Sequence, residues 1–365
     1  MLRSTLNAAI VVVMLQASSP VAASSTTTNA RINLHTATSD FGIFLDQMVT
    51  DVGRSEHKHV SGNIPTTGTR LIRGSRKSSW LEGNRFSFEE LDDHEIELIH
   101  LIRKDMVAAV NHLSVNEMHT DARLAFWLNL HNLTVISHIS DDYPVGNIKD
   151  LLFKSEDGAV PIYFQNFAFI DGRNWSLASI EKHIFANWQN PLVMYGLFYG
   201  TIGSPNIRTQ PYTGHTVWDD LQDNASEFVN SIRGTQIWGK RLAISSHYAR
   251  AANLFPNFDH DVKAHILSQI ESPQWHRRIS QAKKVDPSVD NWRVADFFDG
   301  TSLRGSTSFA QSFSRGGVPM IDFQKMPAHT RSLALEIVRR YKRRNPVVRI
   351  EELNTSPEDK PSPDQ

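Results

Sequence analysis

The chain of 365 residues contains no cysteine, and this absence excludes several kinds of chemistry. Without thiols there are no disulfides, no thiolate metal sites and no cysteine nucleophile. An excess of one charge is also missing, because 38 Lys and Arg stand against 39 Asp and Glu, which gives a net charge of −1. A dedicated nucleic-acid binder usually carries a clear basic excess. We therefore expect no nucleic-acid partner.

Long apolar runs are missing as well. The run from Ala8 to Leu15 is too short to span about 30 Å of hydrocarbon, and no later stretch approaches the roughly 20 residues that a transmembrane helix needs. Arg3 precedes this run, and Val21-Ala22-Ala23 follows it. This pattern predicts a signal peptide over residues 1–23, cleaved before Ser24. Because an exported protein without cysteine needs no oxidative folding, we expect a periplasmic or secreted protein.

With 40% apolar and 21% charged residues, the chain has enough material for a sizeable core. A spacer is expected over 24–38, a first helix from Ser39, a helix-rich domain over 39–345 and a disordered, Pro-rich tail over 354–365. Further helices are expected over 88–113, 121–139, 148–152, 176–188, 216–232 and 260–270, and strands over 160–164, 167–170, 192–199 and 242–245. The prediction is a single helix-rich α+β domain around a small sheet.

A long loop is expected over residues 53–85, where hydrophobic periodicity is lost. It is rich in Gly, Ser and Thr and carries seven basic residues, namely Arg54, Lys58, Arg70, Arg73, Arg76, Lys77 and Arg85. Such long loops are usually lids or disordered segments. We favour a mobile, exposed surface loop over a lid that attracts anions.

Glu181 is the first candidate functional residue. On a helical wheel at 100° per residue it falls within the apolar stripe of the 176–188 helix, beside Ile180 and Ile184. A buried carboxylate needs a partner or a raised pKa. We expect Glu181 to be largely buried and paired with Arg208 or with backbone N–H groups of the loop after Tyr199. The sequence favours neither a structural nor a functional role for Glu181.

The loop from Tyr199 to Arg208 is the second candidate. Gly200 and Gly203 allow close backbone approach, and Arg208 offers a bidentate donor for an anion. Ser204 is a possible nucleophile, although a Ser followed by Pro is more often a helix cap. The chain has no His-Glu-x-x-His sequence, and His131 and His138 stand about 10.5 Å apart along one helix. We expect neither a metal nor a cofactor.

Several motifs occur in an order that resembles the DUF547 family, a domain of unknown function. They are Ala125-Phe126-Trp127-Leu128-Asn129-Leu130-His131-Asn132, Tyr143-Pro144-Val145, Ser176-Leu177 with Ile180-Glu181, Gly200 to Arg208 with Tyr212-Thr213, and Phe298-Asp299 with Ser302-Leu303. The resemblance covers about residues 90–305 and implies that Asn129, Glu181, Arg208 and Asp299 belong to a site. In this chain Tyr199 occupies the position where the family usually has Cys. Lys182 likewise replaces the family's usual His, and His131 replaces its usual Tyr. Thiol chemistry is therefore impossible in this chain.

These observations favour an exported DUF547-like protein that binds a small anionic or peptide-like ligand around Glu181, Tyr199 and the 200–208 loop, with Asn129 and Asp299 as further ligand contacts. One alternative is a hydrolase or transferase that uses Ser204 or Tyr199 with Glu181 as the base. Another is a structural or interaction protein of the cell envelope. The sequence leaves binding and catalysis both open.

Overall fold

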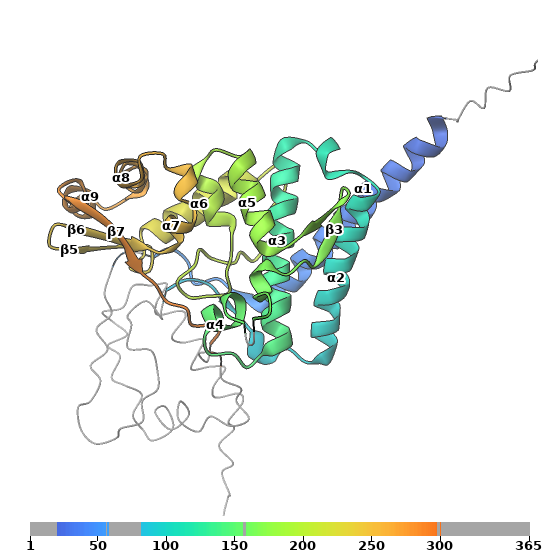
Figure 1. The fold of residues 1–365 in the computed structure, drawn as a ribbon, viewed down its shortest axis with the longest axis horizontal. Helices are drawn as coiled ribbons and strands as arrows, with labels where there is room; N and C mark the ends of the chain where they lie inside the picture. The colour runs from blue at the N-terminus through green and yellow to red at the C-terminus, as the bar shows by residue number, and fades with distance from the viewer. Residues whose placement is uncertain (1–19, 56, 58–81, 156–157, 298–299, 301–365) are drawn as a thin grey trace, which may run out of the picture.

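The computed structural model describes residues 20–55, 57, 82–155, 158–297 and 300 (Figure 1). Residues 1–19 of the predicted signal peptide, most of the 53–85 loop, Asp299 and the 354–365 tail lie outside the described residues. The elements are α1 (Pro20–Met48), β1 (Val49–Thr50), β2 (Arg85–Phe86), η2 (Phe88–Glu90), α2 (Asp93–Asn111), η3 (Val115–Glu117), α3 (Thr120–Asp142), α4 (Ile148–Phe153), η4 (Ile162–Phe164), β3 (Ala168–Ile170), β4 (Arg173–Trp175), α5 (Leu177–Asn187), η5 (Pro191–Gly196), α6 (Val217–Val229), β5 (Thr235–Trp238), β6 (Arg241–Ser245), α7 (His247–Arg250), η6 (Ala252–Leu254), α8 (Phe258–Gln269), α9 (Pro273–Ser280) and β7 (Lys284–Val289).

Helix α3 lies at the centre of the fold and is buried nearly all round between Leu124 and Ile139. Both residues are fully buried, and most of the side chains between them are buried as well. Neighbouring helices α2 and α5 pack against it (Figure 1). The predicted central helix over 121–139 is confirmed.

Two asparagines of α3 hold two distant segments against this helix. The side-chain amide of Asn129 donates to Tyr212 O at 2.8 Å, and its carbonyl oxygen accepts from Tyr212 N at 2.9 Å. Asn132 makes the same kind of double contact, donating to Gly196 O at 2.9 Å and accepting from Phe198 N at 2.9 Å. Because the two asparagines are three residues apart, they share one face of α3. Their side-chain amides satisfy backbone N–H and C=O groups that a neighbouring strand would otherwise have paired with.

Helix α1 begins at Pro20 rather than at Ser39, so the residues expected to form a spacer are helical. Ser39 does not cap this helix, because its hydroxyl donates to His35 O at 2.9 Å one turn back. Thr36 and Thr38 make the same bond to Ile32 O and Leu34 O. These internal bonds satisfy the hydroxyl groups within the helix.

Helix α2 is shorter than the predicted span of 88–113. Asp92 accepts hydrogen bonds from His94 N and Glu95 N, and the Glu95 side chain accepts from Asp92 N. This capping box starts the helix at Asp93. Residues Phe88–Glu90 form a separate 3-10 turn before it.

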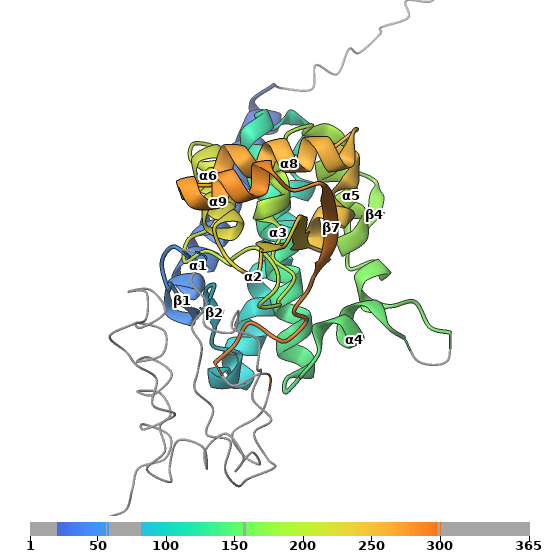
Figure 2. The same cartoon turned by 90° about the vertical axis from the view of Figure 1, so that its left-hand side faces the viewer.

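Three small sheets are described where one was expected. Strands β1 and β2 pair, β3 and β4 form a hairpin, and β5, β6 and β7 form a sheet in which β6 and β7 are parallel. Helix α8 packs against both α9 and β7 (Figure 2). The helix-rich α+β class is confirmed.

Two predicted strands are instead 3-10 helices. Residues Ile162–Phe164 form η4, and residues Pro191–Gly196 form η5. Asn190 caps η5 by accepting from Leu192 N at 3.0 Å, and Pro191 occupies its first position. An apolar run with a capping Asn and a Pro at its start is compatible with a buried helical turn as well as with a strand.

Gly53 and Arg54 are exposed, as expected for the 53–85 loop, but the other described residues of this segment are buried. Ser55 and His57 are 4% and 5% exposed, and Glu82 is 4% exposed. His57 donates or accepts at Thr235 Oγ1 over 2.7 Å and stacks on Trp275. These buried residues are therefore anchored in the fold. Among the described helices, none combines the length and the apolar character needed to cross a bilayer.

Candidate functional site

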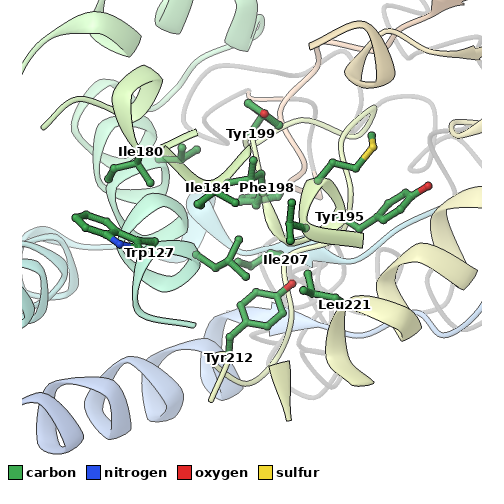
Figure 3. Close-up of a cluster of buried hydrophobic side chains, with 14 of the residues drawn as sticks. Trp127, Ile180, Ile184, Tyr195, Phe198, Tyr199, Ile207, Tyr212 and Leu221 are labelled. Atoms are coloured by element: carbon green, nitrogen blue, oxygen red, sulfur yellow. The ribbon is translucent and has the colours of Figure 1, made fainter. Parts of the chain in front are cut away.

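Glu181 reaches its position because helix α5 is fixed at its start and along one face. Ser176 caps the helix in a reciprocal box with Ser179. Ile180 and Ile184 are fully buried in the core, where Figure 3 shows them beside Phe198 and below Tyr199. The Glu181 side chain is 13% exposed, as its position on the wheel predicts.

Three donors converge on one oxygen of this carboxylate. The hydroxyl groups of Tyr163 and Tyr199 each donate to Glu181 Oε2 at 2.5 Å, and Arg250 Nη2 donates to the same atom at 2.9 Å. Among the described residues, nothing hydrogen-bonds to Oε1. The predicted pairing with Arg208 is wrong, because the ion-pair partner is Arg250.

Arg250 is held inside an aromatic box. Its guanidinium carbon lies 4.8 Å from the ring centroid of Phe153 and 4.9 Å from those of Tyr163 and Tyr199. Its Nε atom is buried without a hydrogen-bond partner, and the side chain is 25% exposed. Within the described structure Nη2 is the only side-chain nitrogen of Arg250 that makes a hydrogen bond, so Nη1 remains a free donor.

Two neutral histidines line the same cluster. The His247 ring lies 4.6 Å from the Tyr199 ring and 5.9 Å from Trp292, and its Nδ1 is buried without a partner. Burial lowers the pKa of His247 to about 3, and the charge of Arg250 acts in the same direction. The His131 ring lies 5.7 Å from the Tyr199 ring, and burial lowers the pKa of His131 to about 4. Neither ring carries a charge near neutral pH.

The two tyrosines remain protonated donors. Burial raises the pKa of Tyr199, and the nearby Glu181 carboxylate raises it further. Burial also raises the pKa of Tyr163. A phenol that resists deprotonation is a poor nucleophile, so this geometry stabilises the Glu181 charge rather than activating Tyr199.

The structure does not bring Arg208 to Glu181. Arg208 Nη2 pairs with Asp220 Oδ1 at 2.5 Å, and its guanidinium lies over the Tyr212 ring. Asn129 is also placed elsewhere, because both ends of its amide bind the backbone of Tyr212. Asp299 lies outside the described residues.

The glycines and the serine of the 200–208 loop contact the protein's own backbone. A Cβ at Gly203 would lie 2.7 Å from Asn291 N, and Gly203 N donates to Asn291 O at 2.9 Å. Gly200 has φ +75°, and a Cβ there would lie 2.1 Å from Ile139. Ser204 is 1% exposed and donates to Thr201 O at 2.8 Å. The groups that approach the backbone closely at these two glycines are therefore the chain segment at Asn291 and helix α3.

A separate polar cavity lies beside Arg208. Its volume is about 230 Å³, below the range of about 300–1,000 Å³ that is usual for ligand pockets. The lining residues are Asp51, Gly53, Arg54, Asn84, Asn206, Arg208, Thr209, Asp223, Asn224 and Glu227. Most of these groups pair with one another, as Arg54 does with Asp223. No cluster of three or more His, Asp or Glu side chains suited to a metal ion occurs in the described part of the chain.

Sequence reasoning missed His247 and Arg250. Both belong to α7, a four-residue helix directly after strand β6, which is too short to show periodicity. Their spacing of three residues places both side chains on one side of a helical turn. This spacing, directly after the strand predicted over 242–245, was the sequence signal that could have identified the two residues.

The described residues thus form a helix-rich α+β domain with an aromatic-lined Glu–Arg pair. A family model described as "Protein of unknown function, DUF547" matches residues 115–229, so the chain contains a DUF547 domain over these residues. The matched segment includes Glu181, Tyr163, Tyr199 and His131, whereas Arg250 and His247 lie beyond its end. Comparisons with curated proteins and with solved structures found no match.

Proposed function

We propose that this chain is an exported protein that binds a peptide-like ligand at the Glu181–Arg250 pair. The observation that carries the proposal is the pair's unused hydrogen-bonding capacity. Glu181 Oε1 has no donor and Arg250 Nη1 has no acceptor among the described residues. One free acceptor beside one free donor matches the N–H and C=O of an amide.

The charge of the site favours a peptide-like ligand over a small anion. The Glu181 carboxylate offsets the charge of Arg250, and both neighbouring histidines are neutral. An anion would therefore meet no net positive charge. The half-buried rings of Phe153 and Trp292 offer apolar surface for a side chain of the ligand.

Binding is favoured over catalysis for a specific reason. The two hydroxyl groups considered as nucleophiles are Ser204, which is buried and bonded to the backbone, and Tyr199, whose pKa is raised. Ser204 donates to backbone carbonyl groups and not to a base, and the raised pKa of Tyr199 opposes transfer of its proton to Glu181. Export rests on the sequence pattern of residues 1–23.

A thermal-shift panel tests this function. The purified mature protein is melted with N-acetylated dipeptide amides of varied side chains and, separately, with acetate, succinate and phosphate. A peptide present at 100 times its Kd adds about 2.7 kcal/mol of stability. We expect a stabilising peptide in the first group and no stabilisation by the anions.

Two variants locate the binding. Arg250→Lys keeps the charge but removes the planar fork, so it should lose most of the peptide response. Arg208→Lys is the matched control, because Arg208 is 23% exposed against 25% for Arg250 and also pairs with a carboxylate. Absence of any stabilising peptide, or an equal loss in both variants, would overturn the proposal.

A further inference from the structure

The open end of the β5–β6–β7 sheet carries a cluster of basic side chains around one exposed tryptophan. We call this cluster the basic edge and define it as Trp238, Lys240, Arg241, Arg277, Arg278, Lys283 and Lys284. All seven are exposed. Residues 235–245 and 273–289 contain six Lys and Arg but a single acidic residue, Asp286. The basic edge therefore has a strong local excess of positive charge in a chain whose net charge is −1.

Backbone pairing holds these side chains together. Strand β6 pairs with β5 at one side, with Trp238 opposite Arg241, and with β7 at the other, with Arg241 opposite Lys284. Lys283 N donates to Lys240 O at 2.8 Å. Figure 1 shows β5, β6 and α9 at the same end of the molecule. The cluster is thus a fixed feature of the sheet.

Helix α9 adds the remaining charges. Arg278 lies over the ring of Trp275 and its Nη2 reaches Ile237 O at 3.4 Å, which ties the helix to strand β5. Arg277 is its exposed neighbour. Both stand in the last turn of α9, where cations are favoured by the helix dipole.

Trp238 gives the basic edge a second property. Its side chain is 49% exposed at the end of the β5–β6 hairpin, where Gly239 takes a positive φ of +63° in the turn. Its ring is supported by the guanidinium of Arg241 at 4.7 Å. The basic edge therefore presents a large aromatic ring, held in position by a cation, among exposed positive charges.

We propose that the basic edge docks on an anionic phospholipid surface, with Trp238 at the level of the lipid headgroups. Tryptophan prefers the membrane–water interface, and clustered Lys and Arg are attracted to anionic lipids. A single exposed ring does not provide the series of stacking platforms that single-stranded nucleic acid requires. A protein interface would be expected to deplete charged residues at its centre.

Vesicle cosedimentation of the full mature chain tests this inference. Vesicles of phosphatidylglycerol and phosphatidylcholine are compared with vesicles of phosphatidylcholine alone, at low and high salt. We expect partition into the anionic vesicles only, with a loss at high salt. Each Lys or Arg near such a surface contributes about a fivefold gain in partition.

Charge-matched variants test whether the basic edge itself is the surface that binds the vesicles. Lys283→Gln with Lys284→Gln should reduce partition about 30-fold. Lys104→Gln with Lys182→Gln removes the same charge from exposed positions on α2 and α5 and should change partition less than twofold. Trp238→Ala should weaken binding while leaving its salt dependence in place. Failure to bind anionic vesicles, equal loss in both double variants, or binding to an oligonucleotide without binding to lipid would each overturn the assignment.

Discussion

Replacement of Glu181 by Gln is the most informative single change in the candidate site. The new side chain keeps the shape of the carboxylate, and its carbonyl oxygen can still accept from Tyr163, Tyr199 and Arg250. What is lost is the charge. Hydrogen bonds to a charged group contribute about 1.5–3 kcal/mol against about 1 kcal/mol for neutral ones, so three weakened bonds would together cost about 1.5–6 kcal/mol if they were independent.

The charge of Arg250 is also left without its partner. Breaking a fully buried pair costs about 3–5 kcal/mol, but Arg250 is 25% exposed, and solvent screening reduces this cost. The two contributions overlap because they describe the same contacts. We expect Glu181→Gln to lower the free energy of unfolding by about 2–4 kcal/mol.

Urea denaturation followed by circular dichroism measures this loss, and Asp220→Asn is the matched control. Asp220 is 14% exposed against 13% for Glu181, and each pairs with a partly exposed arginine. Both variants should lose stability, but only Glu181→Gln should also lose its response to peptide. A loss below about 0.5 kcal/mol for Glu181→Gln, beside a normal loss for Asp220→Asn, would refute the geometry described for the site.

Three further predictions follow from other parts of the chain. Burial raises the pKa of Glu82 from 4.5 to about 8, so between these pH values the folded state keeps a proton that the unfolded state has lost. The free energy of unfolding should therefore fall by up to about 1.4 kcal/mol per pH unit as the pH rises from 4.5 to 8. Urea denaturation at several pH values should show a weaker dependence of stability on pH for Glu82→Gln than for the wild type. Ser204→Ala should cost about 1 kcal/mol in urea denaturation through its lost bond to Thr201 O and should leave the peptide response unchanged. N-terminal sequencing of exported protein should find the mature start near Ser24, whereas a full-length chain retained in membranes would contradict the signal-peptide prediction.

The helices predicted well are those whose pattern is long and unambiguous. Helix α3 was predicted from an apolar run, and helix α5 from a capping Ser followed by periodic apolar residues. The apolar stretch over 192–199 was interpreted as a strand because a short buried run has no period that separates strand from helix. Its backbone groups at Gly196 and Phe198 bond to the side chain of Asn132, which a local pattern does not reveal.

The candidate site was predicted in part. Glu181 and Tyr199 were identified and do meet, and the burial of Glu181 followed from wheel geometry. The partner of Glu181 was assigned to the wrong arginine, because the choice between Arg208 and Arg250 depends on tertiary contacts between α5 and α7. The motif residues Asn129 and Gly203 contact the protein's own backbone. A motif alone therefore does not distinguish residues that stabilise the fold from residues that form the site.

A crystal structure of the protein soaked with the best-stabilising N-acetylated dipeptide amide tests the central claim most directly. We predict that the peptide lies at the Glu181–Arg250 pair, with an N–H donating to Glu181 Oε1 and a C=O accepting from Arg250 Nη1. The aromatic rings of Phe153 and Trp292 should contact its side chain. A peptide found instead in the polar cavity beside Arg208, or bound with both free atoms of the pair still facing solvent, would contradict the account.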